Sequence, residues 1–162
     1  QTTWSFSAFE TNIDNLIAFD LATFLPHNVS RARIRGVEAQ ASRRFDNWTF
    51  GANYTHLDPR NRDSGNVLPR RARDAGRLDI SYGNERFAIG TIVNIVGSRY
   101  DNLANTTKLD DYTTIDLVGE VRLGDWFVQG KIANASDEKY ETAAFYYQDG
   151  RSYFLTLGYQ PR

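Results

Sequence analysis

Apolar and polar residues alternate along most of the chain with a period of two, the spacing expected of β-strands that have two different faces. The closing segment shows this most clearly, because Tyr153, Leu155, Leu157 and Tyr159 alternate with small or polar residues. Runs of this kind end at Gly, Asn or Asp, which favour turns. We therefore predict an all-β protein with about nine antiparallel strands and no helix.

The predicted strands occupy most of the sequence. They span residues 3–11, 16–20, 31–45, 48–57, 68–82, 87–100, 112–123 and 126–134, with a last strand after Gly150. Short turns are predicted around Asn12, Asp46, Asn84 and Asp125. Long connections are predicted at 21–30, 58–67, 101–111 and 135–149.

This alternation of short and long connections favours a membrane barrel over a soluble β-sandwich. An outer-membrane barrel has short turns on its periplasmic side and long loops on its extracellular side, whereas a sandwich has no such requirement. The last strand then runs from a long loop to the periplasmic side. About nine strands would leave free edges in a membrane, so we expect the C-terminal portion of a larger antiparallel transmembrane β-barrel.

The two faces predicted for these strands fit lipid on one side and water on the other. Aromatic residues gather beside the short turns, at Phe45, Trp48, Tyr82, Phe87, Trp126, Phe127 and Tyr159. Others lie towards the far strand ends, at Tyr54, Tyr100, Tyr112 and Tyr153. Two aromatic girdles are typical of membrane barrels. The opposite face carries polar side chains suited to a wet lumen, at Arg77, Asp79, Asp116, Glu120, Arg122, Gln129 and Lys131.

Composition agrees with this interpretation without requiring it. The chain has 162 residues, of which 41% are hydrophobic, and its mean hydropathy is −0.54. A soluble β-protein and a barrel share such averages, since only every second strand residue of a barrel meets lipid. The longest apolar run, Phe87–Gly97, is far shorter than the roughly 20 residues of a membrane-spanning helix. The net charge of −1 and the lack of a basic patch predict no nucleic-acid partner.

The sequence contains no motif for covalent catalysis or metal binding. Cysteine is absent, and His27 and His56 are far apart without a third zinc ligand nearby. The loop acids lack the regular spacing of a calcium loop: Asp58, Asp63, Asp101, Asp110 and Asp111. No nucleophile, histidine and acid form a recognisable grouping. We therefore predict no catalytic residue, no metal site and a protein that is not an enzyme.

Several stretches resemble the end of a TonB-dependent outer-membrane receptor. Arg33–Ala39 resembles a strand motif common to that family, and Leu68–Ala72 resembles a motif that opens a later strand. The segment 131–142, followed by 150–153, is similar to the last hairpin of the family. Within the family, the branch that transports cobalamin is the most similar, through Gly97–Asp101 and the stretch from 131 to 159.

The resemblance implies a barrel of about 22 strands closed around an N-terminal plug, with uptake driven by the TonB complex. Residues 1–162 would then be the C-terminal part of the barrel domain, with the plug domain absent from this sequence. The implied location is the outer membrane of a Gram-negative bacterium. The implied partners are a corrinoid or siderophore ligand, the lipid bilayer with its lipopolysaccharide, the TonB complex acting through the plug, and the barrel assembly machinery.

The resemblance also nominates site residues. Arg70 and Tyr147 match positions that face a corrinoid ligand, and Arg71 is added because strand parity counted back from Leu78 turns Arg70 towards lipid and Arg71 inward. The residues of the last strand that would form the membrane girdle and the assembly signal are Tyr153, Leu155, Leu157 and Tyr159. The family usually ends on an aromatic residue two positions after Tyr159, whereas this chain has Pro161 and Arg162.

Four functions remain open at this point. The first is TonB-energised transport of cobalamin or a related corrinoid, and the second is uptake of a ferric siderophore by the same kind of receptor. The third is an outer-membrane barrel enzyme, and the fourth is a soluble β-protein that binds a ligand.

Overall fold

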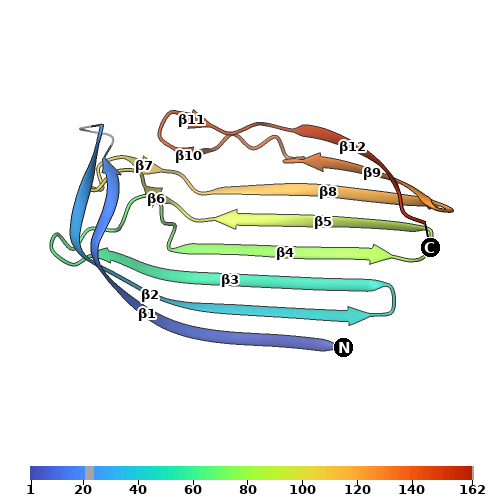
Figure 1. Cartoon of the computed structure of the whole chain (residues 1–162), viewed down its shortest axis with the longest axis horizontal. Helices are drawn as coiled ribbons and strands as arrows, with labels where there is room; N and C mark the ends of the chain where they lie inside the picture. The colour runs from blue at the N-terminus through green and yellow to red at the C-terminus, as the bar shows by residue number, and fades with distance from the viewer. Residues whose placement is uncertain (21–23, 162) are drawn as a thin grey trace.

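The computed structural model describes residues 1–20 and 24–161, and every regular element within these residues is a β-strand. In this described part, eight strands form one antiparallel sheet in the order β1-β2-β3-β4-β5-β8-β9-β12 (Figure 1). Their bounds are β1 (Thr2–Asp20), β2 (Leu25–Phe45), β3 (Trp48–Asn61), β4 (Asp74–Gly83), β5 (Phe87–Val96), β8 (Tyr112–Leu123), β9 (Trp126–Ala133) and β12 (Ser152–Tyr159). The predicted all-β antiparallel class is confirmed.

Short strands pair within two of the long loops. They are β6 (Arg99–Tyr100) with β7 (Lys108–Leu109), and β10 (Glu141–Ala143) with β11 (Tyr146–Tyr147). Among the described residues, none forms a helix that could cross a membrane.

The connections alternate in length as predicted from Asp46 onwards. Tight turns follow β2, β4 and β8 at one end of the sheet, while the loops after β3, β5 and β9 gather at the other end (Figure 1). Asp46 and Gly124 allow two of these turns because they take left-handed φ angles of 50° and 66°. The sheet therefore has a turn end and a loop end.

The turn predicted around Asn12 and the separate strand 16–20 are wrong. β1 runs without interruption from Thr2 to Asp20 and pairs with β2 along its length. Asn15 takes a left-handed φ of 58°, which reverses the alternation of faces, so Ile13 before it and Leu16 after it both pack on the core. A break in the alternation caused by one residue has the same appearance in sequence as a turn.

Other predicted boundaries also moved. β2 begins at Leu25, so most of the connection predicted at 21–30 is strand, and residues 21–23 lie outside the described part. β3 continues to Asn61, whereas β4 begins only at Asp74, six residues after the predicted start at Leu68. Leu68 and Pro69 are instead buried in the loop, where the proline has no N–H for a ladder hydrogen bond.

Through the middle of the sheet, one face is apolar and the other is polar. Tyr153, Leu155, Leu157 and Tyr159 lie on the apolar face of β12, with Leu155 80% exposed. The polar face bears the residues predicted for it, and these form ion pairs such as Arg77–Asp79 at 2.7 Å and Lys131–Asp116 at 2.9 Å. We call the apolar side the outward face and the polar side the inward face.

The aromatic girdle is present at the turn end of the outward face. Trp48 and Tyr82 have ring centroids 5.1 Å apart, and those of Trp126 and Tyr159 are 5.0 Å apart. Phe127 does not belong to this girdle, because its ring lies over Gly158 on the inward face. Tyr112 also departs from the predicted upper girdle, since it stacks on Tyr140 with centroids 4.1 Å apart.

The two faces exchange polarity near the loop end of β1, β2 and β3. On the outward face, the paired residues Ala8 and Val37 are followed by the paired residues Glu10 and Arg35. On the inward face of the same stretch, Ile34 packs against a core formed by Val29, Ala32 and Leu68. Beyond this level, towards the loop end, the outward face is charged and the inward face packs on the buried core. The apolar part of the outward face therefore ends here.

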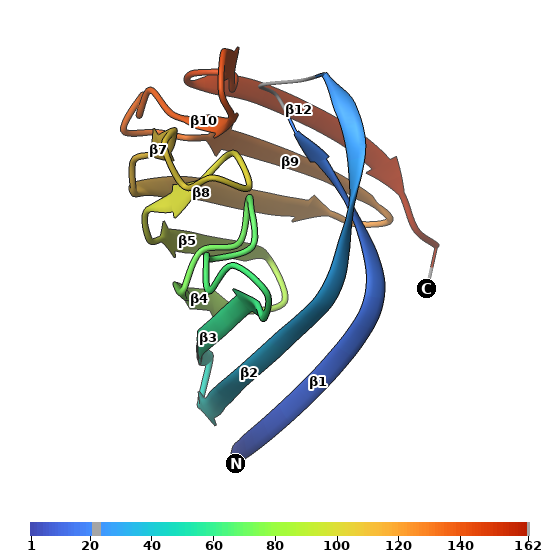
Figure 2. The same ribbon diagram turned by 90° about the vertical axis from the view of Figure 1, so that its left-hand side faces the viewer.

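Figure 2 shows that the β1–β2 hairpin bends at this level and arches across the loop end of the sheet. Ile13, Leu16, Ala18 and Leu103 add to the core beneath it. The buried apolar residues of this cluster therefore lie among the loops and the hairpin, and not between layers of sheet.

Candidate functional site

Direct hydrogen bonds join the loop after β3 to the loop after β5. Asn66 Nδ2 donates to the carbonyl of Leu103 at 2.8 Å. Asn105, which has a left-handed φ of 58°, accepts from the N–H of Val67 and donates to its carbonyl. The two loops therefore form a single ordered surface.

Arg70 contributes an ion pair to the same junction. Its Nε donates to Asp101 Oδ1 at 2.7 Å, and its backbone N–H donates to the carbonyl of Tyr100 at 2.6 Å. Asp101 is 0% exposed, so this pair compensates a carboxylate that is removed from water. Arg70 has a left-handed φ of 57° and lies before the start of β4, so strand parity does not determine where its side chain points.

Arg71 differs from its neighbour because it is partly buried without an ion pair to any residue of the described chain. Burial lowers the pKa of the Arg71 guanidinium. Its planar set of N–H donors is therefore available to an acceptor outside the described chain. Of the two arginines nominated from sequence, Arg71 is the one whose guanidinium is not already bound.

Arg99 connects this surface to the last loop. Its side chain is buried, its guanidinium lies 5.3 Å from the centre of the Tyr112 ring, and its Nη2 donates to the carbonyl of Glu141. Arg99 and Asp101, both within the stretch Gly97–Asp101, therefore have structural roles at the loop end.

Asn134 organises the last loop from a buried position. Its Oδ1 accepts from the N–H of Glu138 at 2.9 Å, and its Nδ2 donates to the carbonyl of the same residue at 2.9 Å. Its own N–H donates to Asp116 Oδ1 at 2.9 Å. Asp137 then accepts from the N–H of Arg151 at 2.9 Å, which returns the chain to β12. This explains the composition of the stretch that resembles the family's last hairpin.

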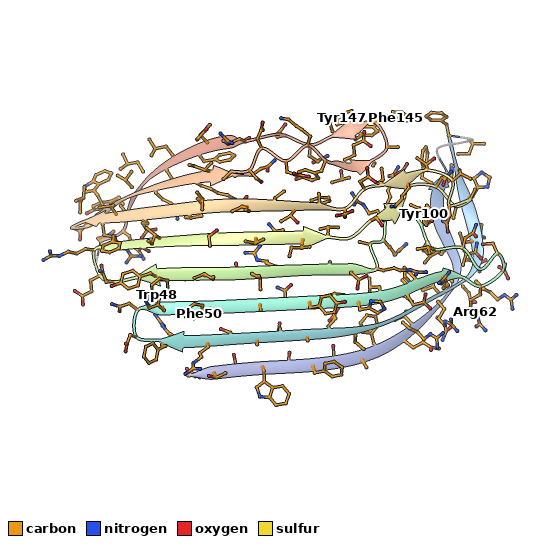
Figure 3. All side chains as sticks on the ribbon, turned by 180° about the vertical axis from the view of Figure 1, so that it is seen from behind. Trp48, Phe50, Arg62, Tyr100, Phe145 and Tyr147 are labelled. Carbon is orange, nitrogen blue, oxygen red and sulfur yellow. The ribbon has the colours of Figure 1, made fainter. Side chains whose placement is uncertain are left out.

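The β10–β11 hairpin exposes consecutive aromatic residues. Phe145 is 86% exposed and Tyr147 is 76% exposed, and Tyr146 between them is also exposed. Phe145 takes a left-handed φ of 69°, an uncommon conformation for an aromatic residue. Figure 3 shows Phe145 and Tyr147 at the loop end, with Tyr100 and Arg62 at the same end and Trp48 and Phe50 towards the turn end.

Sequence reasoning selected Tyr147 and missed Phe145 and Tyr146. The signal was a run of three consecutive aromatic residues inside a predicted loop. Arg70, Arg71 and Tyr147 all lie at the loop end, but within residues 1–20 and 24–161 no hydrogen bond or cation–π contact joins either arginine to Tyr147. They are linked through the loop after β5, which contacts Arg70 on one side and Glu141 on the other.

The loop acids that were considered for calcium are largely occupied by arginines. Asp63 pairs with Arg31 at 2.6 Å, and Asp58 pairs with Arg60 at 2.7 Å. No group of three His, Asp or Glu side chains placed to hold a metal ion occurs in the part of the chain that the structure describes.

Comparison with known proteins identifies the family. The sequence profile described as TonB dependent receptor-like, beta-barrel, matches residues 1–136. The Vitamin B12 transporter BtuB of Photobacterium profundum is 31% identical over 165 residues, covering 97% of this chain and 27% of that protein. The chain therefore spans about a quarter of the length of this relative.

Solved structures share the fold at lower identity. The siderophore receptor PiuA from Acinetobacter baumannii matches with a TM-score of 0.81 and 22% identity, over 98% of this chain and 26% of that chain. The copper transporter OprC matches with a TM-score of 0.81 and 17% identity, over 96% of this chain and 28% of that chain. By name, these proteins are a receptor and a transporter. The resemblance noted in the sequence is confirmed: the chain belongs to the TonB-dependent receptor family and forms part of its β-barrel.

Proposed function

We propose that this chain is the C-terminal part of the barrel domain of an outer-membrane receptor that imports cobalamin or a related corrinoid. The observation that carries the proposal is the division of the sheet into an apolar outward face, a charged inward face and an ordered loop end. The identity of 31% to a protein named as a vitamin B12 transporter supports the choice of ligand. Transport proceeds by binding and gated passage, energised by TonB, without covalent chemistry.

The sheet itself supports a larger barrel. Among the described strands, β1 and β12 stand at the two ends of the order and each has one neighbour. An unpaired strand edge in a bilayer leaves N–H and C=O groups without partners, at a cost of several kcal/mol for each group. Further strands of the protein close the barrel between β12 and β1, and the plug fills its lumen and contacts TonB. The outward residues Tyr153, Leu155, Leu157 and Tyr159 act as membrane girdle and as the signal for the assembly machinery.

The ligand lies over the loop end in this proposal. Tyr147 supplies an exposed aromatic ring, and Arg71 supplies N–H donors for amide or phosphate oxygens of a corrinoid. Arg70 contributes mainly by holding Asp101 and hence the loop on which Arg71 lies. Flat aromatic area and a few directed donors are the usual composition of a binding site for a large ligand.

A ferric siderophore is the second candidate ligand. It is favoured by the fold likeness to PiuA and to the ferripyoverdine receptor of Pseudomonas aeruginosa, the latter with a TM-score of 0.75 and 21% identity over 96% of this chain. The exposed aromatic residues of β10–β11 and the unpaired guanidinium of Arg71 also suit an anionic iron chelate.

Equilibrium binding to the whole receptor in detergent separates the two ligands. We expect cyanocobalamin to bind at micromolar or lower concentration and a ferric siderophore not to compete. Arg71→Ala should weaken binding about tenfold, the effect of losing one charge-assisted hydrogen bond. Arg62→Ala is the matched control, because this exposed arginine lies on the same loop (Figure 3). Tight siderophore binding without corrinoid binding contradicts the first candidate and supports the second.

A further inference from the structure

Arg99, in β6, is a buried cation that no carboxylate of the described chain neutralises. It is 7% exposed, and among residues 1–20 and 24–161 no acidic side chain forms an ion pair with it. Its donors meet backbone carbonyls, since Nη1 donates to Asp110 at 3.5 Å and Nη2 donates to Glu141. The Tyr112 ring faces the same guanidinium at 5.3 Å. A buried charge is costly, so Arg99 depends on these directed contacts.

On one side, Arg99 holds the β10–β11 hairpin at the position opposite Tyr147. Glu141, whose carbonyl accepts from Arg99, is the cross-strand partner of Tyr147. The preceding residue, Tyr140, stacks on the Tyr112 ring with centroids 4.1 Å apart. β10 accordingly lies beside β7 at the loop end (Figure 2). The position of Tyr147 therefore depends on the contacts made by Arg99 and Tyr112.

On the other side, the backbone at Arg99 is joined to the loop that carries Arg71. The carbonyl of Tyr100, the next residue, accepts from the N–H of Arg70 at 2.6 Å. The buried carboxylate of Asp101 accepts from Arg70 Nε at 2.7 Å. Arg71 follows Arg70 directly, so a short hydrogen-bonded stretch of backbone separates it from Arg99.

We propose that Arg99 is a positioning residue, which fixes Tyr147 relative to Arg71 so that the two bind one ligand as a preorganised pair. The inference rests on the proposed function, which assigns ligand contacts to Tyr147 and Arg71. Arg99 is too buried to reach a ligand at the surface, so it acts through the two residues that it holds. A planar guanidinium with directed donors sets both distance and orientation, which apolar packing alone does not. Fixing both contacts before binding reduces the entropy that binding costs.

The test measures cyanocobalamin binding to the whole receptor in detergent, with the variants Arg71→Ala, Tyr147→Ala and their combination. Each single variant should weaken binding, because one ligand contact is lost. In a preorganised pair each contact depends on the other. The loss in the combined variant should therefore be about threefold or more smaller than the product of the two single losses. In an Arg99→Gln background the two losses should multiply.

Further variants separate positioning from a general loss of loop structure. Arg151→Gln removes the hydrogen bond from Arg151 Nε to the carbonyl of Ala135, which measures 2.9 Å and begins and ends within the last loop. The losses should stay coupled in that background. Tyr112→Phe keeps the ring that faces Arg99 and Tyr140, and it should behave as wild type. Tyr112→Leu removes this ring and should reduce the coupling, so it gives the same test should Arg99→Gln fail to assemble.

A measurement without ligand keeps this inference separate from the proposed function. The N–H of Gln148 donates to the carbonyl of Tyr140 at 3.0 Å and therefore reports on the hairpin. Arg70→Ala should raise hydrogen exchange at this amide by about threefold or more in an otherwise wild-type receptor, and should have little effect there in an Arg99→Gln background. Failure of wild type to bind cyanocobalamin contradicts the proposed function, whereas exchange at Gln148 still shows whether Arg99 joins the two loops.

Three results would overturn the role given to Arg99. The first is that the losses multiply in the wild-type background, because the two contacts are then independent. The second is that the coupling in Arg99→Gln or Tyr112→Leu equals that of wild type, or that Arg70→Ala leaves exchange at Gln148 unchanged. The third is that Arg151→Gln also abolishes the coupling, since any disturbance of the last loop would then have this effect.

Discussion

The side-chain amide of Asn105 bonds both backbone groups of Val67: its Oδ1 accepts from the N–H at 2.8 Å and its Nδ2 donates to the carbonyl at 2.9 Å. Val67 is buried, so without the Asn105 amide its N–H and its carbonyl would have neither water nor these hydrogen bonds. One side chain thereby takes the place of a neighbouring strand and joins two loops.

Replacing Asn105 should loosen this junction. Asn105→Ala removes both hydrogen bonds and should destabilise the loop pair by about 1–3 kcal/mol. Asn105→Gly removes the same hydrogen bonds but adopts the left-handed backbone conformation without strain. The difference in stability between the two variants therefore measures the cost of holding alanine in that conformation. Hydrogen exchange at the amides of 62–73 in the whole receptor is the measurement. Wild-type protection in both variants would contradict the role given to the amide.

The two arginines of the loop after β3 should respond differently to substitution. Arg70→Ala leaves Asp101 buried without its ion-pair partner. It should therefore lower the protection of the loop amides from hydrogen exchange by about 1–3 kcal/mol, and it should also lower ligand affinity. Arg71→Ala should reduce affinity with little effect on hydrogen exchange. Arg70→Ala combined with Asp101→Ala should restore part of the protection, because the uncompensated charge is removed. Equal effects of the two single variants on exchange would contradict this division.

Gly36 should tolerate no side chain. A Cβ at this position would lie 2.7 Å from the carbonyl oxygen of His56, 2.7 Å from Leu57 Cδ2 and 2.9 Å from Phe9 Cζ. Gly36→Ala should therefore cost about 1–3 kcal/mol in unfolding from detergent or lipid. Gly119→Ala is the matched control, since nothing lies within 4 Å of a Cβ added there. Equal stability of the two variants would show that the strands move apart without cost.

The last loop should loosen at acid pH. The N–H of Arg151 and then the ammonium group of Lys139 hold the pKa of Asp137 below its ordinary value of 3.8. Because the folded pKa is the lower one, the stabilisation is complete well above pH 3.8 and is lost as the pH falls from there through the folded value. Exchange at the Arg151 amide, corrected for its intrinsic rate, should rise in that range. Asp137→Asn should remove the pH dependence, and a dependence that persists in this variant would assign it to another group.

Much of the fold follows from local pattern. Alternation of faces and turn residues predict β2, β3, β5, β8, β9 and β12 to within a few residues at most ends, since each strand exposes one face to lipid and one to water. The pattern fails at Asn15, where a single left-handed residue reverses the faces within one strand. It fails again at 68–73, where the predicted strand was begun too early, in a loop that buries only Leu68 and Pro69.

The candidate site was less accessible to sequence reasoning. Arg70 was nominated as a ligand contact from the family resemblance, and nothing local in the sequence indicates that Asp101, 31 residues later, is its buried partner. The Asn105–Val67 contact likewise joins residues 38 positions apart. Contacts of this range depend on how the loops pack, which the alternation of strand residues does not encode. The run Phe145–Tyr147, by contrast, is a local signal in the sequence, although only Tyr147 was selected from it.

The exchange of polarity along the β1–β2 hairpin also limits how far these strands can slide. A shift of one residue would turn Arg35 inward among packed apolar side chains and Ile34 outward. A shift of two would keep the faces but move Arg35 to the position of Val37, beside Ala8 on β1, and would take it away from Glu10. The hairpin therefore has one register in which both of its faces are satisfied along their whole length.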